Sequence, residues 1–303
     1  MKAGVLLPLA VFVCVVPGRA PGQPTYSSNV VGFVNLSLPA TNGAAALLAN
    51  PLRAANDEAN TVLLLPDSAD GTTLYKFDLA LQAVVEEPGV YFGGFGWVPA
   101  NLQLPPGEGF WTYPRDYFSA SLAVTFVGEV PAHTVTNRLP AANRYALLAS
   151  QIPAELPIGD ARTTNTLRFP AEDGDTIYLL DPVTQSLKAP FTYYAGFGWS
   201  SANPDDPGPK GPVLPLASSF FVLKGPGATQ TNWFQQGVGG EEGPGLHIEF
   251  LAGSVAVSLT TPAPGYVVQR SPTLAPPTWT DVGAPPVIMP VFQRQAYFRL
   301  MRP

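Results

Sequence analysis

The chain has 303 residues, of which only 13% are charged, while 35 are proline and 29 are glycine. This composition is poor in the Glu, Lys and Arg that cover exposed helix faces, so it argues against long helices. The formal net charge is −6, and the basic residues form no cluster along the sequence. Both features argue against a protein that binds nucleic acid or anionic membrane surfaces.

Hydrophobic residues make up 46% of the chain and aromatic residues 11%, which is enough to build folded cores. The many prolines and glycines are therefore better explained as turns between short strands than as signs of disorder. We expect an all-β fold.

The N-terminus has the order of features that is typical of a secretory signal peptide. Met1 and Lys2 precede an apolar run from Ala3 to Val16, and the small residues of the segment PGRA follow it. We expect residues 1–22 to be a signal peptide, and the mature protein to be secreted or at the cell surface, with the periplasm as the alternative. The apolar run is short for a membrane span, and no later run is long enough, so we expect no integral membrane protein.

Cys14 is the only cysteine, and it lies within the predicted signal peptide. The exported chain would therefore have no disulfide and no thiolate metal ligand. Removal of Lys2 and Arg19 would also change the formal net charge from −6 to −8. We expect this acidity to serve solubility.

Comparison of the chain with itself finds the same segments twice, in the same order. ALLANPL begins at Ala46 and ALLASQI at Ala146, a shift of 146 − 46 = 100 residues. DGTTLYKFD begins at Asp70 and DGDTIYLLD at Asp173, a shift of 173 − 70 = 103 residues. YFGGFGW and YYAGFGW follow, and then LPPGEGFWTY and LPLASSFFVL. This order predicts two homologous β repeats of ordinary domain size.

The two predicted repeats cover residues 28–130 and 131–237, and the pattern leaves open whether each is a β-barrel or a β-sandwich. In each repeat an Asp-Gly pair predicts a turn before a strand of alternating side chains. A later turn contains Gly107 in the first repeat and Ala217 in the second. Because alanine is strained at positive φ, we expect the geometry of this turn to differ between the repeats.

Residues 238–245 form a predicted glycine-rich linker, and residues 246–303 a predicted C-terminal β module. Ile248 and Phe250 alternate with polar neighbours, which is typical of a half-buried strand. We expect about five strands here, which make only a small core. We therefore expect a small sandwich-like module that leans on the second repeat.

The series NVVGFVNLSLPA, ALLANPL, DGTTLYKFD, GFGW, LPPGEGFWTY and VTFVGEVP resembles a family of secreted tandem-repeat β proteins that is abundant in Verrucomicrobia and related bacteria. The resemblance covers residues 28–236. The closing segment YVVQRSPTLAPPTWTDVG, with QAYFRL, is similar to the immunoglobulin-like C-terminal modules of other exported proteins from those bacteria. The resemblance implies an exported all-β protein, and it implies no specific activity.

Few residues suit catalysis. His133 lies between the predicted repeats and His247 on the polar face of a predicted strand, so we expect both to be exposed and structural. No GxSxG, P-loop or HExxH motif is present. Paired carboxylates of the glycosidase type are the remaining candidates, but their turn and linker positions favour solvated loop charges. These carboxylates are Glu86-Glu87, Glu172-Asp173-Asp175, Asp205-Asp206 and Glu241-Glu242.

The segments PDSADGT and AEDGDT contain oxygen ligands of the kind that calcium prefers. Neither segment has the spacing of a calcium-binding loop, so the preferred interpretation is an Asx turn. We expect no catalytic residue, no metal site and no cofactor.

The repeated aromatic motif has two interpretations. In the first, the indole rings pack against a neighbouring strand, and the glycines let the backbone approach closely. In the second, the rings form a stacking platform for sugars, because flat apolar rings with polar rims suit carbohydrates. We favour the packed corner. The platform of the second interpretation consists of Tyr91, Phe92, Phe95, Trp97, Tyr193, Tyr194, Phe197 and Trp199. The candidate ligand-binding residues among these are Tyr91, Trp97, Tyr193, Tyr194 and Trp199.

Together, these features predict a noncatalytic exported scaffold or cell-surface interaction protein. The alternative is a carbohydrate-binding accessory protein that uses exposed aromatic side chains, and an enzyme is the third class. The expected partner is an extracellular protein or a glycan.

Overall fold

A computed structural model describes residues 25–40, 44–202, 208–238, 243–251 and 253–302. The predicted signal peptide lies outside these residues, as do the pairs Asp205-Asp206 and Glu241-Glu242. The fold is 46% strand and 3% helical, which confirms the all-β class. In the described part of the chain, the helical residues belong to one α-helical turn, α1 (Ala59–Val62), and one 3-10 turn, η1 (Asp67–Ala69). Among the described residues no sheet closes into a barrel, so the barrel alternative is wrong.

The first unit runs from β2 to β9. Its two long strands, β2 (Val30–Pro39) and β9 (Ser121–Val130), pair antiparallel along their whole length. Its second sheet has the order β3-β8-β4-β6-β7, and β5 (Ala83–Val84) pairs with β4. The strands of that sheet are β3 (Ala46–Ala49), β8 (Gly109–Tyr113), β4 (Thr73–Asp78), β6 (Gly89–Phe92) and β7 (Gly96–Val98).

The second unit runs from β10 (Val135–Arg138) to β20 (Asn232–Gln235), and these two strands pair with each other. Its larger sheet has the order β11-β19-β13-β16-β17. Short pairs join β12 (Leu156–Pro157) to β18 (Val213–Leu214) and β14 (Leu180–Asp181) to β15 (Ser186–Leu187). The strands of the larger sheet are β11 (Tyr145–Ala149), β19 (Ser219–Leu223), β13 (Thr176–Tyr178), β16 (Phe191–Tyr194) and β17 (Gly198–Ser201).

The two units use their aligned segments in the same places. The sequence pairs ALLANPL with ALLASQI, and these segments form β3 and β11, the first strand of each larger sheet. The aromatic motifs form β6-β7 and β16-β17, the last two strands of each sheet. This shared strand order is consistent with the predicted duplication.

Reciprocal hydrogen bonds join the two units. Gln82 accepts a hydrogen bond from the Tyr145 amide (2.7 Å) and donates one to its carbonyl oxygen (3.1 Å). Gln185 accepts from the Ala45 amide (2.5 Å) and donates to its carbonyl oxygen (3.4 Å). Ala45 and Tyr145 directly precede the aligned ALLA segments, so each unit gives the other the same contact. This is the geometry of an isologous interface, here within one chain.

The turns that contain Gly107 and Ala217 also meet the opposite unit. The Ala149 amide donates to Gly107 O at 3.0 Å, and the Ala49 amide donates to Ala217 O at 2.9 Å. The backbone of Gly107 has φ +90°, and that of Ala217 has φ +56°. We expected the second turn to avoid positive φ, and this expectation is wrong. Like Gly107, Ala217 lies in the left-handed region. The hydrogen bond from the Ala49 amide to Ala217 O offsets part of the strain of the alanine side chain.

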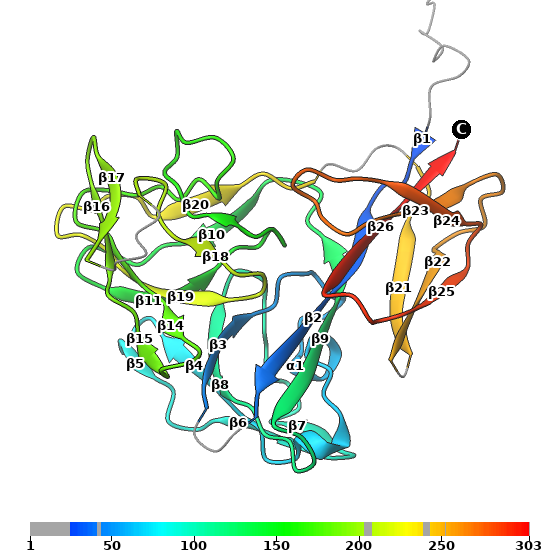
Figure 1. The fold of residues 1–303 in the computed structure, drawn as a ribbon, viewed down its shortest axis with the longest axis horizontal. Coiled ribbons are helices and arrows are strands. Elements are labelled where there is room, and N and C mark those ends of the chain that lie inside the picture. Colours follow the sequence, from blue (N-terminus) through cyan, green and yellow to red (C-terminus); the bar gives the residue numbers. More distant parts are fainter. Residues whose placement is uncertain (1–24, 41–43, 203–207, 239–242, 252, 303) are drawn as a thin grey trace, which may run out of the picture.

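The C-terminal unit has two sheets and confirms the predicted alternation, since Ile248 is buried and His247 is exposed. One sheet contains β21 (Leu246–Leu251), β22 (Ser254–Leu259) and β25 (Val287–Pro290). The other joins β24 (Thr280–Gly283), β23 (Val267–Ser271) and β26 (Gln295–Arg302) to β2 and β9 of the first unit, and β1 (Thr25–Tyr26) also pairs with β26. Figure 1 shows β26 of the C-terminal unit and β2 of the first unit side by side, where these two units meet.

The expectation that this unit leans on the second repeat is therefore wrong about the partner. Successive side chains of a strand point in opposite directions. One face of β2 therefore packs in the core of the first unit, and the other face packs in the core of the C-terminal unit. Val30 and Val34 belong to the core of the first unit, whereas Val31 and Phe33 belong to the core of the C-terminal unit. The second unit contributes a smaller contact, in which the Tyr297 hydroxyl donates to Pro153 O at 2.9 Å.

Candidate functional site

The repeated aromatic motif forms the same hairpin in both units. Tyr91 lies opposite Trp97 on β6 and β7, and Tyr193 lies opposite Trp199 on β16 and β17. The ring centroids of the two pairs are 5.6 and 5.4 Å apart, in edge-to-face geometry. The indole N–H groups donate to backbone carbonyl oxygens, at 3.2 Å for Trp97 and 2.9 Å for Trp199. The structure thus forms the packed corner, since a buried indole is stable when its N–H has a partner.

The five predicted ligand-binding residues divide into two groups. Trp97, Trp199 and Tyr91 are buried, with exposed fractions of 1%, 2% and 7%. Their rings lie in the two cores and cannot form the stacking platform of the carbohydrate interpretation. Tyr193 is half-buried, and Tyr194 is 51% exposed. These two tyrosines are the predicted residues that remain accessible to a ligand.

The Asp-Gly turns hold each hairpin against its unit. Asp70 Oδ1 accepts a hydrogen bond from the Gly93 amide at 3.0 Å, and Asp173 Oδ1 accepts one from the Ala195 amide at 2.8 Å. Gly93 and Ala195 occupy aligned positions in the motif. Asp70 and Asp173, which would be ligands in the calcium interpretation, therefore accept hydrogen bonds from backbone N–H groups. No group of three or more metal-ligating side chains occurs within the described residues.

The tips of the two hairpins each expose a phenylalanine. Phe95 is 89% exposed and Phe197 is 84% exposed, and both lie between glycines of positive φ. The carbohydrate interpretation includes both rings in its stacking platform, but they are not among the five candidate ligand-binding residues. The available signal was the Gly-Phe-Gly order, because glycines of left-handed φ place the intervening residue at a turn, where its side chain points into solvent.

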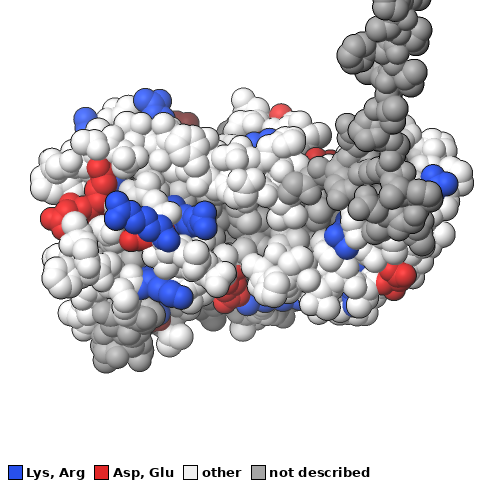
Figure 2. Space-filling model, turned by 90° about the horizontal axis from the view of Figure 1, so that it is seen from above, with Lys and Arg blue, Asp and Glu red and all other residues white. Residues whose placement is uncertain are grey.

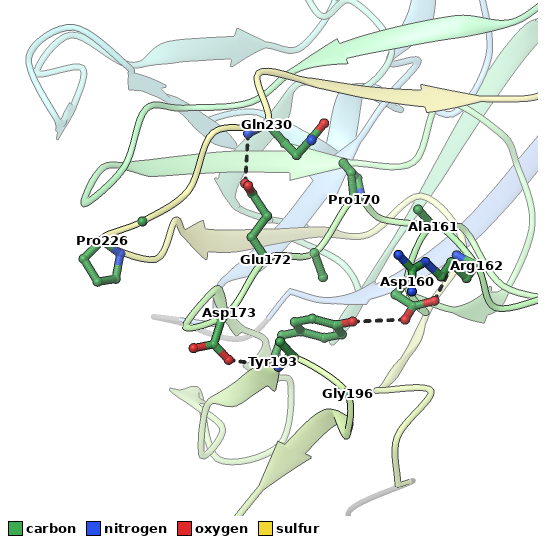
Figure 3. Close-up of a pocket in the computed structure, with 13 residues that line it drawn as sticks. Asp160, Ala161, Arg162, Pro170, Glu172, Asp173, Tyr193, Gly196, Pro226 and Gln230 are labelled. Atoms are coloured by element: carbon green, nitrogen blue, oxygen red, sulfur yellow. Dashed lines mark hydrogen bonds between the residues drawn. The ribbon is translucent and has the colours of Figure 1, made fainter.

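A pocket of about 660 Å³ lies beside the hairpin of the second unit. Figure 3 shows the ring of Tyr193 lying toward Asp160, and the carboxylate of Glu172 pointing toward the backbone of Gln230. The Tyr193 hydroxyl donates to Asp160 Oδ2 at 3.1 Å. The other polar side chains of the lining are those of Arg162, Asp173 and Gln230. The pocket thus has one aromatic wall and a polar rim.

Hydrogen bonds hold two carboxylates of this pocket, those of Asp160 and Glu172, in their charged form. Burial alone would raise the pKa of Asp160, but hydrogen bonds from Thr163, Arg162 and Tyr193 lower it below its usual value. Burial also opposes ionisation of Glu172, yet the amides of Gln230 and Thr229 lower its pKa to about 2. A general acid needs a raised pKa, so neither side chain suits that role.

A buried ion pair, Lys224 and Asp175, contacts Glu172. Lys224 and Asp175 have exposed fractions of 1% and 0%, and the Lys224 ammonium contacts Asp175 Oδ2 and lies 3.3 Å from Glu172 Oε2. The Gly225 amide donates to Asp175 Oδ1 at 2.8 Å. Aligned positions of the first unit hold an uncharged pair, Thr72 and Pro114. The fold of a unit therefore does not itself require these two charges.

The other sequence candidates lie apart from this pocket. His133 and His247 are exposed, as are Glu86 and Glu87. None of these four residues lines the pocket beside Tyr193. The structure therefore brings together one predicted ligand-binding tyrosine and the acidic segment Glu172-Asp173, and it separates them from both histidines.

We predict that Glu172→Gln lowers the free energy of unfolding at pH 7 by about 1–2 kcal/mol, after allowance for solvent screening. The pKa of this carboxyl is about 4.5 in the unfolded chain and about 2 in the folded protein. Its contribution is therefore complete above pH 4.5 and is lost as the pH falls toward 2. Urea unfolding of both proteins between pH 7 and pH 3 measures the difference, which should shrink with falling pH. The control is Glu249→Gln on the exposed side of β21, and an equal loss there would contradict the assignment.

Comparison with known proteins gives no assignment: no family model, no curated protein and no solved structure matches the chain. None of the helices in the described part of the chain is long and apolar enough to cross a membrane.

Proposed function

We propose that the protein is a noncatalytic exported interaction protein that contacts its partner with the tips of its two aromatic hairpins. The observation that carries the proposal is the exposure of Phe95 and Phe197, at 89% and 84%, at aligned positions of two units. Each phenylalanine lies at the tip of a hairpin whose tryptophan, Trp97 or Trp199, packs in the core of its unit. Single exposed apolar residues are common on protein surfaces and need no explanation. These two rings differ from them because the same residue type is exposed at the same position of both units.

A rigid exposed ring is an efficient contact group. It offers a large apolar area and loses little conformational freedom when it is buried against a partner. Around Phe95 the structure also exposes Phe92, Tyr117 and Phe118, the last at 90%. The Tyr117 amide donates to Ser68 O in η1, next to the aspartate that accepts the Gly94 amide, so these side chains belong to the same end of the first unit.

The surface and the sequence support an exported partner-binding role. Charged side chains are sparse on the face in Figure 2, where acidic and basic groups gather at the end that holds the second unit. Residues 1–22 have the pattern of a signal peptide, and the resemblance to secreted tandem-repeat proteins points the same way. We therefore place the protein outside the cytoplasm, with an extracellular protein or a glycan as its partner.

A second candidate function is carbohydrate binding in the pocket beside Tyr193. The observation that favours it is the combination of the half-buried Tyr193 ring with the polar rim of Asp160, Arg162 and Gln230. Sugars bind where an aromatic ring covers their apolar face and where planar polar groups reach their hydroxyls. In this candidate the buried tryptophans have only a structural role.

We expect the double variant Phe95→Ser/Phe197→Ser to bind purified peptidoglycan sacculi at least tenfold more weakly than the unchanged chain. Its melting temperature should stay within about 2 °C, because both rings are exposed. Cosedimentation measures binding, and Phe234→Ser, at an exposed ring on β20, is the matched control. Equal loss in the control, or full binding by the double variant, would overturn the role of the tips.

The carbohydrate candidate has a separate readout. Affinity electrophoresis in gels that contain xylan, laminarin or pullulan should show retardation that Arg162→Ala and Gln230→Ala abolish, whereas the tip variants leave it intact. If no gel retards the chain, the pocket is not a polysaccharide site. A turnover of any of these polymers that disappears on replacement of one carboxylate would contradict the noncatalytic assignment.

A further inference from the structure

A second pocket, of about 780 Å³, lies where the three units meet. Strands β2 and β3 of the first unit form one wall, the segments 179–182 and 213–219 of the second unit form another, and the loop 292–294 of the C-terminal unit forms part of the rim. Its size is in the range of small-molecule sites, about 300–1,000 Å³, and junctions between domains are a frequent place for them.

The walls of this pocket, which we call the junction pocket, are mainly aliphatic. Leu36 and Leu47 come from the first unit, and Leu179 and Leu216 from the second. Phe292 adds a ring that is 87% exposed at the rim. An exposed ring beside an apolar pocket is favourably buried when a ligand with apolar surface enters.

The charged side chains that line the junction pocket are cationic, although the carboxylates of Glu155 and Asp181 lie next to them outside the lining. Its described lining contains two cations, Lys188 and Arg294, and no carboxylate. Arg294 forms an ion pair with Glu155 at 2.8 Å, and both side chains are about half exposed. An exposed pair of this kind is weak, so the guanidinium can also accept an anionic ligand group.

One lining residue has an unmet hydrogen-bond requirement. Ser219 is 3% exposed, and its hydroxyl has no hydrogen-bond partner among the described residues. A buried polar group without a partner is costly in a protein interior. The oxygen is closed to water from the pocket, so we assign it no role in ligand binding.

We propose that the junction pocket binds a small anionic amphiphile. The apolar chain of the ligand lies among the leucines and under Phe292, and its carboxylate or other anionic head lies at Lys188 and Arg294. This site is separate from the hairpin tips and goes beyond the function proposed above. Because the ligand touches all three units, its binding also stabilises their arrangement by mass action.

Isothermal titration calorimetry of residues 23–303 with decanoate, below its micelle concentration, tests the proposal. We expect saturable one-to-one binding and a melting temperature that rises with decanoate concentration. Decyltrimethylammonium has the same apolar chain with the opposite charge and should bind at least tenfold more weakly. Equal binding of the two probes, or no saturable binding of decanoate, would overturn the proposal.

Three variants locate the site. Phe292→Ser should weaken decanoate binding about fivefold or more, and Lys188→Met/Arg294→Met should weaken it about tenfold and remove the preference for the anionic probe. Ile288→Ser is the matched control, because Ile288 is 68% exposed in the same unit and does not line the pocket. These residues lie at the surface, so the variants should fold. An effect of Ile288→Ser equal to that of Phe292→Ser would show that decanoate binds elsewhere and contradict the proposal.

Discussion

Replacement of Lys224 by methionine is expected to lower the free energy of unfolding by about 3–5 kcal/mol. The change leaves Asp175 fully buried beside Glu172, without its cationic partner. A carboxylate that loses both water and its counter-ion is among the most costly groups in a protein interior. Urea unfolding at pH 7, followed by tryptophan fluorescence, measures the loss.

The matched test is the double variant Lys224→Met/Asp175→Thr. Thr72 occupies the position of Asp175 in the first unit, so threonine is compatible with this backbone. Removing both charges avoids the buried, unpaired carboxylate, and we expect the double variant to recover more than half of the loss. Part of the loss should remain, because Asp175 also accepts hydrogen bonds from the amides of Gly225 and Glu172. A double variant that is less stable than Lys224→Met would contradict this account of the ion pair.

The second large effect is expected for Gly32→Ala, with a loss of about 2–3 kcal/mol. A Cβ atom on Gly32 would lie 2.6 Å from Ala296 O and 2.6 Å from Tyr297 Cδ1, both in β26. A backbone oxygen on a paired strand cannot move away without breaking the ladder between β2 and β26. We therefore expect the C-terminal unit to loosen from the first unit.

Thermal unfolding gives the stability change, and limited proteolysis shows where the chain becomes accessible. Cleavage of Gly32→Ala should be faster after residue 245, while the second unit stays protected. Gly227→Ala is the control, because a Cβ atom there meets nothing within 4 Å. The prediction is falsified if both variants unfold at the same temperature. An unchanged digestion pattern would show that the C-terminal unit does not depend on β2.

Within the candidate site, the sequence predicted the packing of the aromatic motif but not the pocket beside it. The repetition of rings and glycines indicated a packed corner, and the burial of Trp97 and Trp199 agrees with that interpretation. The pocket beside Tyr193 was not predicted, because its rim comes from segments that lie far apart in the chain, such as Asp160 and Gln230. The ion pair below it was missed for the same reason, since nothing in the sequence near Asp175 indicates Lys224 as its partner.

The sequence by itself determined the all-β class and the places of many strands and turns. That information is local: Pro and Gly end strands, and alternation with a period of two marks the buried face of a strand. Only the tertiary structure decided that β2 pairs with β26, that the two units exchange the Gln82 and Gln185 contacts, and that three units enclose a pocket. The physical reason is that an alternating strand specifies which face it buries but not which strand covers that face. The choice of partner depends on shape and hydrogen-bond complementarity between residues that are remote in sequence.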